Sequence, residues 1–191
     1  MRQPKISIIS AALISFCLIL SGCKGPESYL HATADFSYIK KVAIAPFSNF
    51  TNDKFASGRV MNVVATEILR RGFFDVVEFG EAFKVLGEEG LKEGGLLTKE
   101  IAERAGKRLN VEAIIIGSVH QYGDTRVGNA SFPEVSLSLK LIDISSYAIL
   151  WESTHNLKGD DISTQLFGIG SKSPDDLCRK LVSEMLDTLF I

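Results

Sequence analysis

Residues Ala113 to Val119 are the stretch that most constrains the fold, because they are almost entirely apolar. A short apolar run of this kind, with neither helical nor alternating spacing, is typical of a strand that is covered on both faces. Such a strand needs a sheet with other elements packed on each side of it. We therefore place residues 113–119 at the centre of a sheet in an α/β domain.

The segments before this strand predict a strand–helix–strand unit. Residues 41–47 form a short apolar strand, and residues 55–71 repeat Val60, Val64 and Ile68 at the four-residue spacing of an amphipathic helix that Gly72 ends. Residues 73–79 supply the second strand. In a βαβ unit of this type the strands run parallel and the crossover is right-handed. Shorter helices are expected over residues 81–87 and, capped by Thr98, over residues 99–109.

The segments after the central strand predict a hairpin and a final helix. Residues 134–141 alternate strictly, with an apolar set that shares one side of the strand: Val135, Leu137, Leu139 and Leu141. Residues 148–152 follow a turn and should pair with them in antiparallel fashion. Ser173-Pro174-Asp175-Asp176 is a strong start for a helix that runs to about Phe190. The prediction is a single compact α/β domain whose central mixed β-sheet has helices packed on it, starting with a βαβ unit and ending with a β-hairpin and a C-terminal helix.

Residues 1–22 match a lipoprotein signal peptide. Arg2 and Lys5 precede an apolar run of about 15 residues, shorter than the roughly 20 that a membrane-spanning helix needs. The run ends in Leu20-Ser21-Gly22-Cys23, which resembles the bacterial lipobox. That resemblance implies cleavage before Cys23 and acylation (palmitate) of this cysteine, so that the membrane is a partner through a lipid anchor. An ordinary secretory signal that ends near a cysteine is the alternative.

The mature chain should form one domain behind a tether. Residues 23–38 show no sustained periodicity and are predicted as the tether, and residues 39–191 as the domain. Lys24 stands where an inner-membrane retention signal would place an aspartate, which favours the periplasmic face of the outer membrane. With 19 basic and 23 acidic residues the mature chain has a net charge of −4, which argues against a nucleic-acid partner.

The sequence predicts no catalytic residues, no metal site and no cofactor, hence no enzyme. His120 and His155 lack neighbours at metal-ligand spacing. Ser37-x-x-Lys40 matches the nucleophile signature of penicillin-interacting serine enzymes, but the companion elements of that signature are absent. Cys178 lies on an apolar helical face, so we expect a buried, inert thiol.

Three phrases, taken in this order and spacing, resemble the CsgG-like bacterial lipoproteins: residues 42–51, 109–119 and 139–151. Relatives in this group include the curli secretion channel lipoprotein, LpoB-type activators of peptidoglycan synthases, and a domain similar to the amino-terminal part of TolB. The resemblance implies a non-enzymatic binding or scaffolding component for assembly or secretion of cell-envelope or surface structures. An activator of a peptidoglycan synthase and an oligomeric outer-membrane secretion channel of the curli type are the alternatives.

The channel-forming relatives carry two membrane hairpins per subunit, and this chain is short at both positions. A membrane hairpin needs on the order of 20 residues, more than residues 121–133 or 158–172 provide, so we expect no pore. The second segment places Leu166, Phe167 and Ile169 among glycines. We expect these three residues to contact a protein partner of the envelope or, in a homo-oligomer, another copy. Packing of the three against the core is the alternative.

Acylation of Cys23 can be tested by metabolic labelling. Wild-type protein should incorporate a fatty-acid analogue, whereas Cys23→Ala should not, because the thiol that receives the lipid is gone. Cys178→Ala is the control and should label like the wild type. Equal labelling of wild type and Cys23→Ala would contradict the lipobox assignment.

Overall fold

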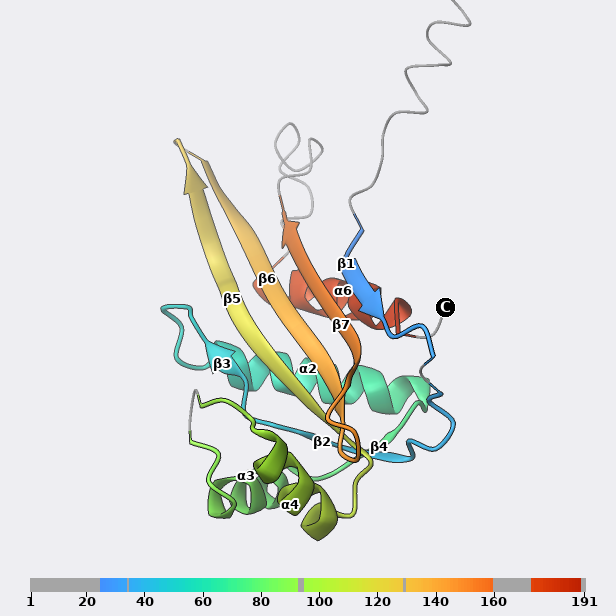
Figure 1. Ribbon diagram of the computed structural model, residues 1–191. Coiled ribbons are helices and arrows are strands. Elements are labelled where there is room, and N and C mark those ends of the chain that lie inside the picture. Colours follow the sequence, from blue (N-terminus) through green and yellow to red (C-terminus); the bar gives the residue numbers. More distant parts are fainter. Residues whose placement is uncertain (1–24, 34, 93–94, 129, 160–172, 190–191) are drawn as a thin grey trace, which may run out of the picture.

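A seven-stranded mixed sheet forms the centre of the computed structural model, which describes residues 25–33, 35–92, 95–128, 130–159 and 173–189 (Figure 1). The strand order is β1-β7-β6-β5-β2-β4, and β3 pairs with β5 outside this path. The strands are β1 (Glu27–Leu30), β2 (Lys41–Ile44), β3 (Ser48–Asn49), β4 (Asp75–Val76), β5 (Ala113–Val127), β6 (Ala130–Asp143) and β7 (Ile149–Lys158).

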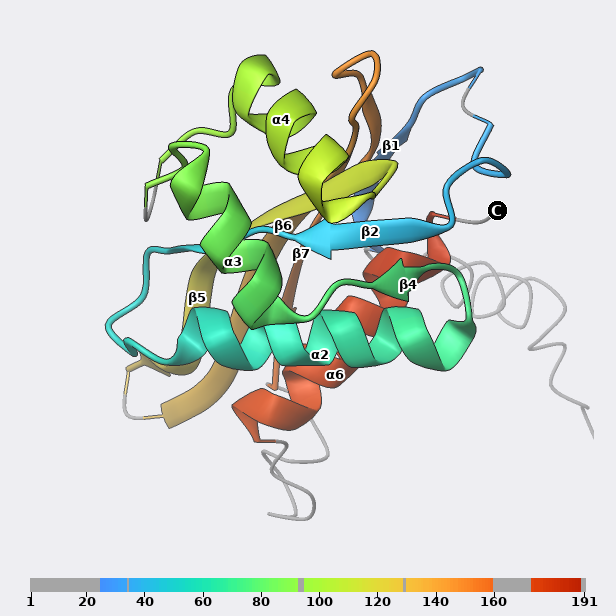
Figure 2. The ribbon, with the colours of Figure 1, turned by 90° about the horizontal axis from the view of Figure 1, so that it is seen from below.

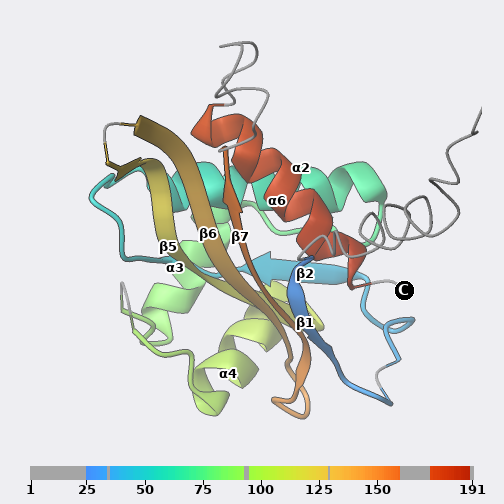
Figure 3. The same ribbon diagram turned by 90° about the horizontal axis from the view of Figure 1, so that it is seen from above.

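Helices cover both faces of the sheet, as Figures 2 and 3 show. α2 (Ala56–Arg71) and α6 (Pro174–Asp187) pack on one face, and α3 (Phe79–Glu88) and α4 (Lys99–Leu109) pack on the other. Each pair of helices packs on one face of the sheet and buries a separate set of apolar residues there. Within the described residues, no helix combines the length and the hydrophobicity of a membrane span.

The central position predicted for residues 113–119 is confirmed. β5 pairs in parallel with β2, where Val42 faces Ala113, and in antiparallel fashion with β6, where Ile115 faces Leu141. Ile114 and Ile115 are buried on opposite faces, one in each core. The predicted parallel pairing of the first two strands is also confirmed, since β2 pairs with β4 across α2.

The alternation of β6 is confirmed on its apolar side, where all four predicted residues are buried: Val135, Leu137, Leu139 and Leu141. The opposite side is only partly covered, because α3 and α4 reach the β2 end of the sheet and leave its upper part open (Figure 1). There Ser138 Oγ lies 3.0 Å from His120 Nε2 and 2.9 Å from Thr154 Oγ1. Glu134 departs from the expected exposure, because Asn156 and Lys158 of β7 bind its carboxylate at 2.9 and 3.4 Å and bury it.

The helix ends follow the predicted signals. Gly72 ends α2 with a left-handed φ of 68°, and Thr98 Oγ1 accepts the Ile101 N–H at the start of α4. Ser173 and Asp176 form a reciprocal capping box at the start of α6. These caps satisfy backbone groups that a helix end leaves without partners.

Several elements differ in length from the prediction. β4 is shorter than residues 73–79, because the Glu78 carboxylate accepts the Glu81 N–H at 3.0 Å and starts α3 already at Phe79. β5 and β6 are longer than predicted, since their ladder continues beyond the buried layer to the pair Val127–Ala130. An alternating apolar pattern does not predict these outer parts of the two strands, because the outer parts lie outside the core. α6 ends at Asp187, earlier than the predicted Phe190.

The predicted tether, residues 23–38, is not free over its whole length. Residues 27–30 form β1, which pairs with β7 so that Glu27 faces Thr154 and Leu30 faces Trp151. All four residues of β1 are exposed, and the strand lies at the edge of the sheet. The lack of an apolar pattern, which suggested a tether, reflects this exposure.

The close packing of α4 on the turn after β6 can be tested at Gly106. A Cβ at this position would lie 2.7 Å from Ile144 Cγ2, so Gly106→Ala should lower the free energy of unfolding by about 1–2 kcal/mol despite alanine's better helix propensity. Gly58→Ala in α2 is the matched control, because its Cβ would meet nothing within 4 Å, and it should stabilise by about 0.5–1 kcal/mol. Urea unfolding of both variants measures the difference, and equal effects would contradict this packing.

Candidate protein-interaction surface

The four site residues predicted from the sequence, namely Cys23, Leu166, Phe167 and Ile169, lie outside the described residues. Cys178 is fully buried as expected, and burial raises the pKa of its thiol to about 12. His155 is also buried and its Nε2 lies 2.7 Å from Glu184 Oε2 of α6. Within the described part of the chain, no group of three or more His, Cys, Asp or Glu is arranged to hold a metal ion.

Residues 49–55 comprise the last residue of β3 and the connection to α2, and their own polar groups hold them in place; we call this segment the aromatic loop. Asn49 Nδ2 donates to the Asp53 carbonyl at 2.8 Å, and the Thr51 hydroxyl donates to Asn49 Oδ1 at 2.8 Å. Asp53 Oδ1 in turn accepts the Phe55 N–H at 2.9 Å and its Oδ2 pairs with Arg59 of α2 at 3.0 Å. Local bonds of this kind are typical of Asn, Asp and Thr in turns.

The aromatic loop presents two large apolar side chains to solvent. Phe50 is 69% exposed and Phe55 is 60% exposed. The Phe50 ring stacks on His120 of β5 at 5.8 Å with an interplanar angle of 5°, and Lys54 Nζ lies 4.9 Å from the centre of the Phe55 ring. Exposed aromatic residues on a rigid support are typical of protein–protein contact surfaces.

The sheet itself fixes where the aromatic loop stands. Asn49 pairs with Val119 of β5, and the Phe50 N–H donates to the Val119 carbonyl at 2.9 Å. Immediately beyond this point, at His120, the register between β5 and β6 shifts. The loop therefore borders the place where the long β5–β6 hairpin leaves the layered body (Figure 1).

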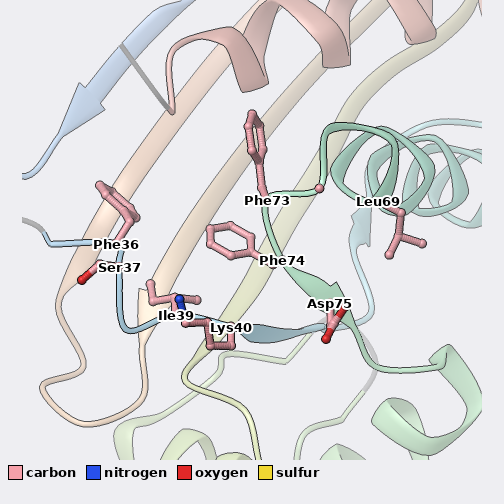
Figure 4. Close-up of a pocket in the computed structure, with 9 residues that line it drawn as sticks. Phe36, Ser37, Ile39, Lys40, Leu69, Phe73, Phe74 and Asp75 are labelled. Atoms are coloured by element: carbon pink, nitrogen blue, oxygen red, sulfur yellow. The ribbon is translucent and has the colours of Figure 1, made fainter.

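A groove of about 510 Å³ lies at the opposite end of α2 (Figure 4). One wall comes from the segment before β2 and the other from the end of α2 and the start of β4. The residues that line it include Phe36, Ile39, Lys40, Leu69, Phe74 and Asp75. In Figure 4 the Phe74 ring lies between the two walls, and it is buried in the core on this face of the sheet. Leu69, in the last turn of α2, is 54% exposed.

Hydrogen bonds to residues far along the chain hold the first wall of the groove. The Tyr38 hydroxyl donates to Asp143 Oδ1 at 2.5 Å, and Glu112 Oε2 accepts the N–H groups of Lys40 and Lys41 at 3.0 and 2.8 Å. Asp143 is itself buried at the end of β6. These hydrogen bonds fix the position of the first wall relative to the sheet.

The pKa of Asp143 shows how strongly these donors act. Burial by itself raises the pKa of this carboxyl, but hydrogen bonds from Ser145, Tyr38 and Ser146 outweigh burial and lower the pKa to about 2. Asp143 therefore stays ionised at any pH near neutrality and serves as an acceptor for the groove wall.

Ion pairs hold the second wall. Arg71, at the end of α2, pairs with Glu67 and with Asp187 of α6 at 2.7 Å each and donates to the Ser183 carbonyl at 2.9 Å. Its guanidinium also lies 5.7 Å from the centre of the Phe73 ring. Hydrogen bonds from Arg70 and Arg71 lower the pKa of Glu67 to about 2, so this cluster stays charged at neutral pH.

Sequence analysis found neither the aromatic loop nor the groove. The loop had a signal, since Phe50 and Phe55 stand in an otherwise polar stretch of Asn, Thr, Asp and Lys residues. The groove had none, because its walls are 29 or more residues apart along the chain. Ser37 and Lys40 lie in this groove, where the Ser37 N–H donates to Asp35 Oδ1 at 2.8 Å.

No protein-family model matches the sequence, and no curated protein matches it. Among solved structures, the PelC dodecamer from Paraburkholderia phytofirmans is 17% identical, with a TM-score of 0.60 over 86% of this chain and 97% of PelC. Lipoprotein GNA1162 from Neisseria meningitidis is 16% identical, with a TM-score of 0.56 over 78% of this chain and 97% of GNA1162. The LpoB C-terminal domain from Escherichia coli is 16% identical, with a TM-score of 0.46 over 66% and 88%.

These likenesses establish that the chain shares its fold with a known lipoprotein and with a protein that forms a dodecamer. They do not single out the CsgG-like family, to which the sequence phrases were assigned, and nothing in them points to curli assembly. At 16–17% identity the agreement concerns the path of the chain and the order of its elements.

The fixed groove wall can be tested through Tyr38→Phe, which removes one donor from buried Asp143. We expect a loss of about 1–2 kcal/mol in the free energy of unfolding at pH 7. The folded-state pKa of Asp143 lies below its ordinary value of 3.8, so this stabilisation is present above about pH 4 and is lost as the pH falls toward 2. The gap between wild type and variant should therefore narrow over that range.

Tyr29→Phe is the matched control, because Tyr29 lies on the exposed edge strand, and it should change stability by less than about 0.5 kcal/mol. Denaturant titrations at pH 7 and pH 3 measure both variants. A Tyr38→Phe effect that is as small as that of the control, or that does not change with pH, would contradict the assignment.

Proposed function

We propose that this protein is a lipid-anchored, non-enzymatic scaffold on the periplasmic face of the outer membrane, which self-associates and binds a protein partner during assembly or secretion of envelope or surface structures. The observation that carries the proposal is the aromatic loop, where a rigid polar network holds Phe50 and Phe55 in solvent. Exposed apolar groups favour association, and rigid ones lose little conformational entropy when they associate. An activator of a peptidoglycan synthase would be one member of this class.

The state of the carboxyl groups supports binding rather than acid–base catalysis. In the described residues, every carboxyl group whose pKa is clearly shifted has it lowered, through hydrogen bonds within the fold; Glu67 and Asp143 are examples. A general acid or base works best with a pKa near the working pH, which such groups lack. They contribute instead to a fixed surface.

The fold likeness supports self-association. This chain covers 97% of the length of PelC, which was solved as a dodecamer. A fold that builds a dodecamer in one protein can present surfaces for association in another, and most soluble homo-oligomers are symmetric.

β1 supports an anchor close to the bilayer. If Cys23 carries the lipid, only Lys24, Gly25 and Pro26 separate it from the first residue of the sheet, Glu27. Four residue steps span at most about 14 Å. The domain would then sit directly at the membrane surface, where anchored copies also meet one another at high local concentration.

Self-association can be tested on the acylated full chain purified from membranes in mild detergent. Sedimentation velocity should show a homo-oligomer, and chemical crosslinking in intact cells should yield adducts of the protein with itself and with an envelope protein. A monomer at every concentration, together with no adduct in cells, would contradict the proposed function.

A further inference from the structure

β1 has one open edge. It is the last strand at its end of the sheet, and within the described residues it pairs with β7 alone (Figure 3). Directly after the strand, the His31 N–H donates to the Leu150 carbonyl of β7 at 3.0 Å. Backbone groups alternate in direction along a strand, so every second residue before His31 also bonds toward β7. Ser28 and Leu30 lie between these positions and direct their N–H and C=O groups away from the sheet.

The composition of β1 leaves this edge available for another strand. Lysine, proline and bulges are common means by which natural proteins block an edge strand. β1 has none of the three, since it reads Glu-Ser-Tyr-Leu and pairs with β7 in an unbroken register. Tyr29 is 51% exposed and Leu30 is 39% exposed. Both the backbone groups and two large side chains are therefore accessible to an added strand.

We propose that β1 of one copy pairs in antiparallel fashion with β1 of a second copy, so that two sheets join across a two-fold axis. The inference rests on the proposed homo-oligomer and assigns one of its interfaces. Ser28 of each copy pairs with Leu30 of the other, and each such pair exchanges both N–H···O=C bonds. Tyr29 lies on the axis and faces Tyr29 of the second copy, an aromatic cross-strand pair that stabilises the contact.

This register is the one that uses both outward residues of each strand. A shift by two residues in one direction pairs Leu30 with Pro26 of the second copy, which has no N–H to donate. A shift by two in the other direction pairs Ser28 with Ala32 of the second copy, which lies beyond β1 in a turn. Either shift therefore loses backbone hydrogen bonds.

The same register makes the strand complementary to itself in charge. Glu27 of each copy stands opposite His31 of the other, so a carboxylate meets an imidazole at both ends of the paired segment. A neutral imidazole can donate a hydrogen bond to a carboxylate, and a protonated one forms an ion pair with it. Each favourable pair occurs twice, as in any two-fold contact. This self-complementarity identifies a second copy, rather than an unrelated strand, as the occupant of the edge.

The position of β1 next to the anchor favours this pairing. If Cys23 carries the lipid, β1 begins within about 14 Å of it in every copy. Copies in one bilayer then hold their β1 edges close to the same surface and at high local concentration. The anchor matters because one pair of short strands buries less area than a stable dimer in solution usually does.

Engineered cysteines can report the register in isolated membranes that contain the acylated full chain. Directly opposed residues of a non-hydrogen-bonded pair have Cα atoms about 4.5 Å apart, which suits a disulfide. Tyr29→Cys should therefore give a disulfide-linked dimer under mild oxidation, and the native Cys178 should not interfere because it is buried.

Leu30→Cys on the same strand is the matched control. The two Leu30 positions are offset by two residue steps, which places their Cα atoms about 8 Å apart, too far for a disulfide. This variant should give no dimer. No dimer from Tyr29→Cys, or an equally strong one from Leu30→Cys, would overturn the proposed pairing.

The outward backbone groups can be tested by Ser28→Pro in the Tyr29→Cys background. Proline removes the N–H that points away from the sheet and leaves the bonds to β7 in place. The yield of disulfide-linked dimer should fall at least about fivefold. Ser28→Ala is the control, because it keeps this N–H, and its yield should match that of the Tyr29→Cys parent. Equal yields from the proline and alanine variants would contradict the strand pairing.

A charge exchange tests the ends of the paired segment without changing the backbone. In the same background His31→Glu places two carboxylates opposite each other and should lower the dimer yield several-fold. Adding Glu27→Lys should restore the yield, because opposite charges then face each other again with their positions exchanged. Thermal unfolding checks that each variant stays folded. A double variant that dimerises no better than His31→Glu alone would overturn the register.

The outcomes distinguish this inference from the proposed function. If the wild type self-associates but Tyr29→Cys gives no disulfide, the interface lies elsewhere and the scaffold function stands. If the wild type is monomeric and forms no adducts in cells, both fail. A Tyr29→Cys protein that crosslinks to a different envelope protein, and not to itself, would assign the edge to an unrelated strand and overturn the pairing of two copies.

Discussion

The pairing of β5 is the constraint on which the rest of the structure depends. Its first half is bonded to β2 and β3 on one edge and to β6 on the other, and it is buried between two helical layers. A buried strand must satisfy its backbone groups within the sheet, so these pairings leave little freedom to the elements on either side. The same strand carries the aromatic loop through the Val119 carbonyl, so the candidate surface inherits the rigidity of the core.

The parts of the fold that sequence analysis predicted are those whose signal is local. The apolar run at residues 113–119, the alternation at residues 134–141 and the caps at Thr98 and Ser173 each identify an element from a few neighbouring residues. β1 carried no such signal, because a strand exposed on both faces needs no apolar pattern and is specified only by its partner β7. The same holds for the outer parts of β5 and β6, which pair with each other beyond the core.

The candidate site divides along the same line. Exposed aromatic residues in a polar loop can be noticed in a sequence, although only the structure shows that Asn49, Thr51 and Asp53 hold them in place. The groove depends on Tyr38 reaching Asp143 and Arg71 reaching Asp187, pairs that are more than one hundred residues apart. Single-sequence patterns do not contain such pairings, so the groove emerges only with the fold.

The register of β1 limits how the domain can stand on a bilayer. Glu27 pairs with Thr154, Thr154 pairs with Ser138, and Ser138 pairs with Ser118, so the start of β1 lies at the height of Ser118 in β5. From Ser118, β5 continues to Val127 toward the side from which the chain enters β1. Nine residue steps of strand cover roughly 30 Å, about twice the reach of the lead from Cys23. If Cys23 carries a lipid, the strands therefore cannot stand perpendicular to the bilayer with the whole sheet outside the headgroup layer. The strands would have to lean over, bringing the hairpin flank of the body down against the bilayer.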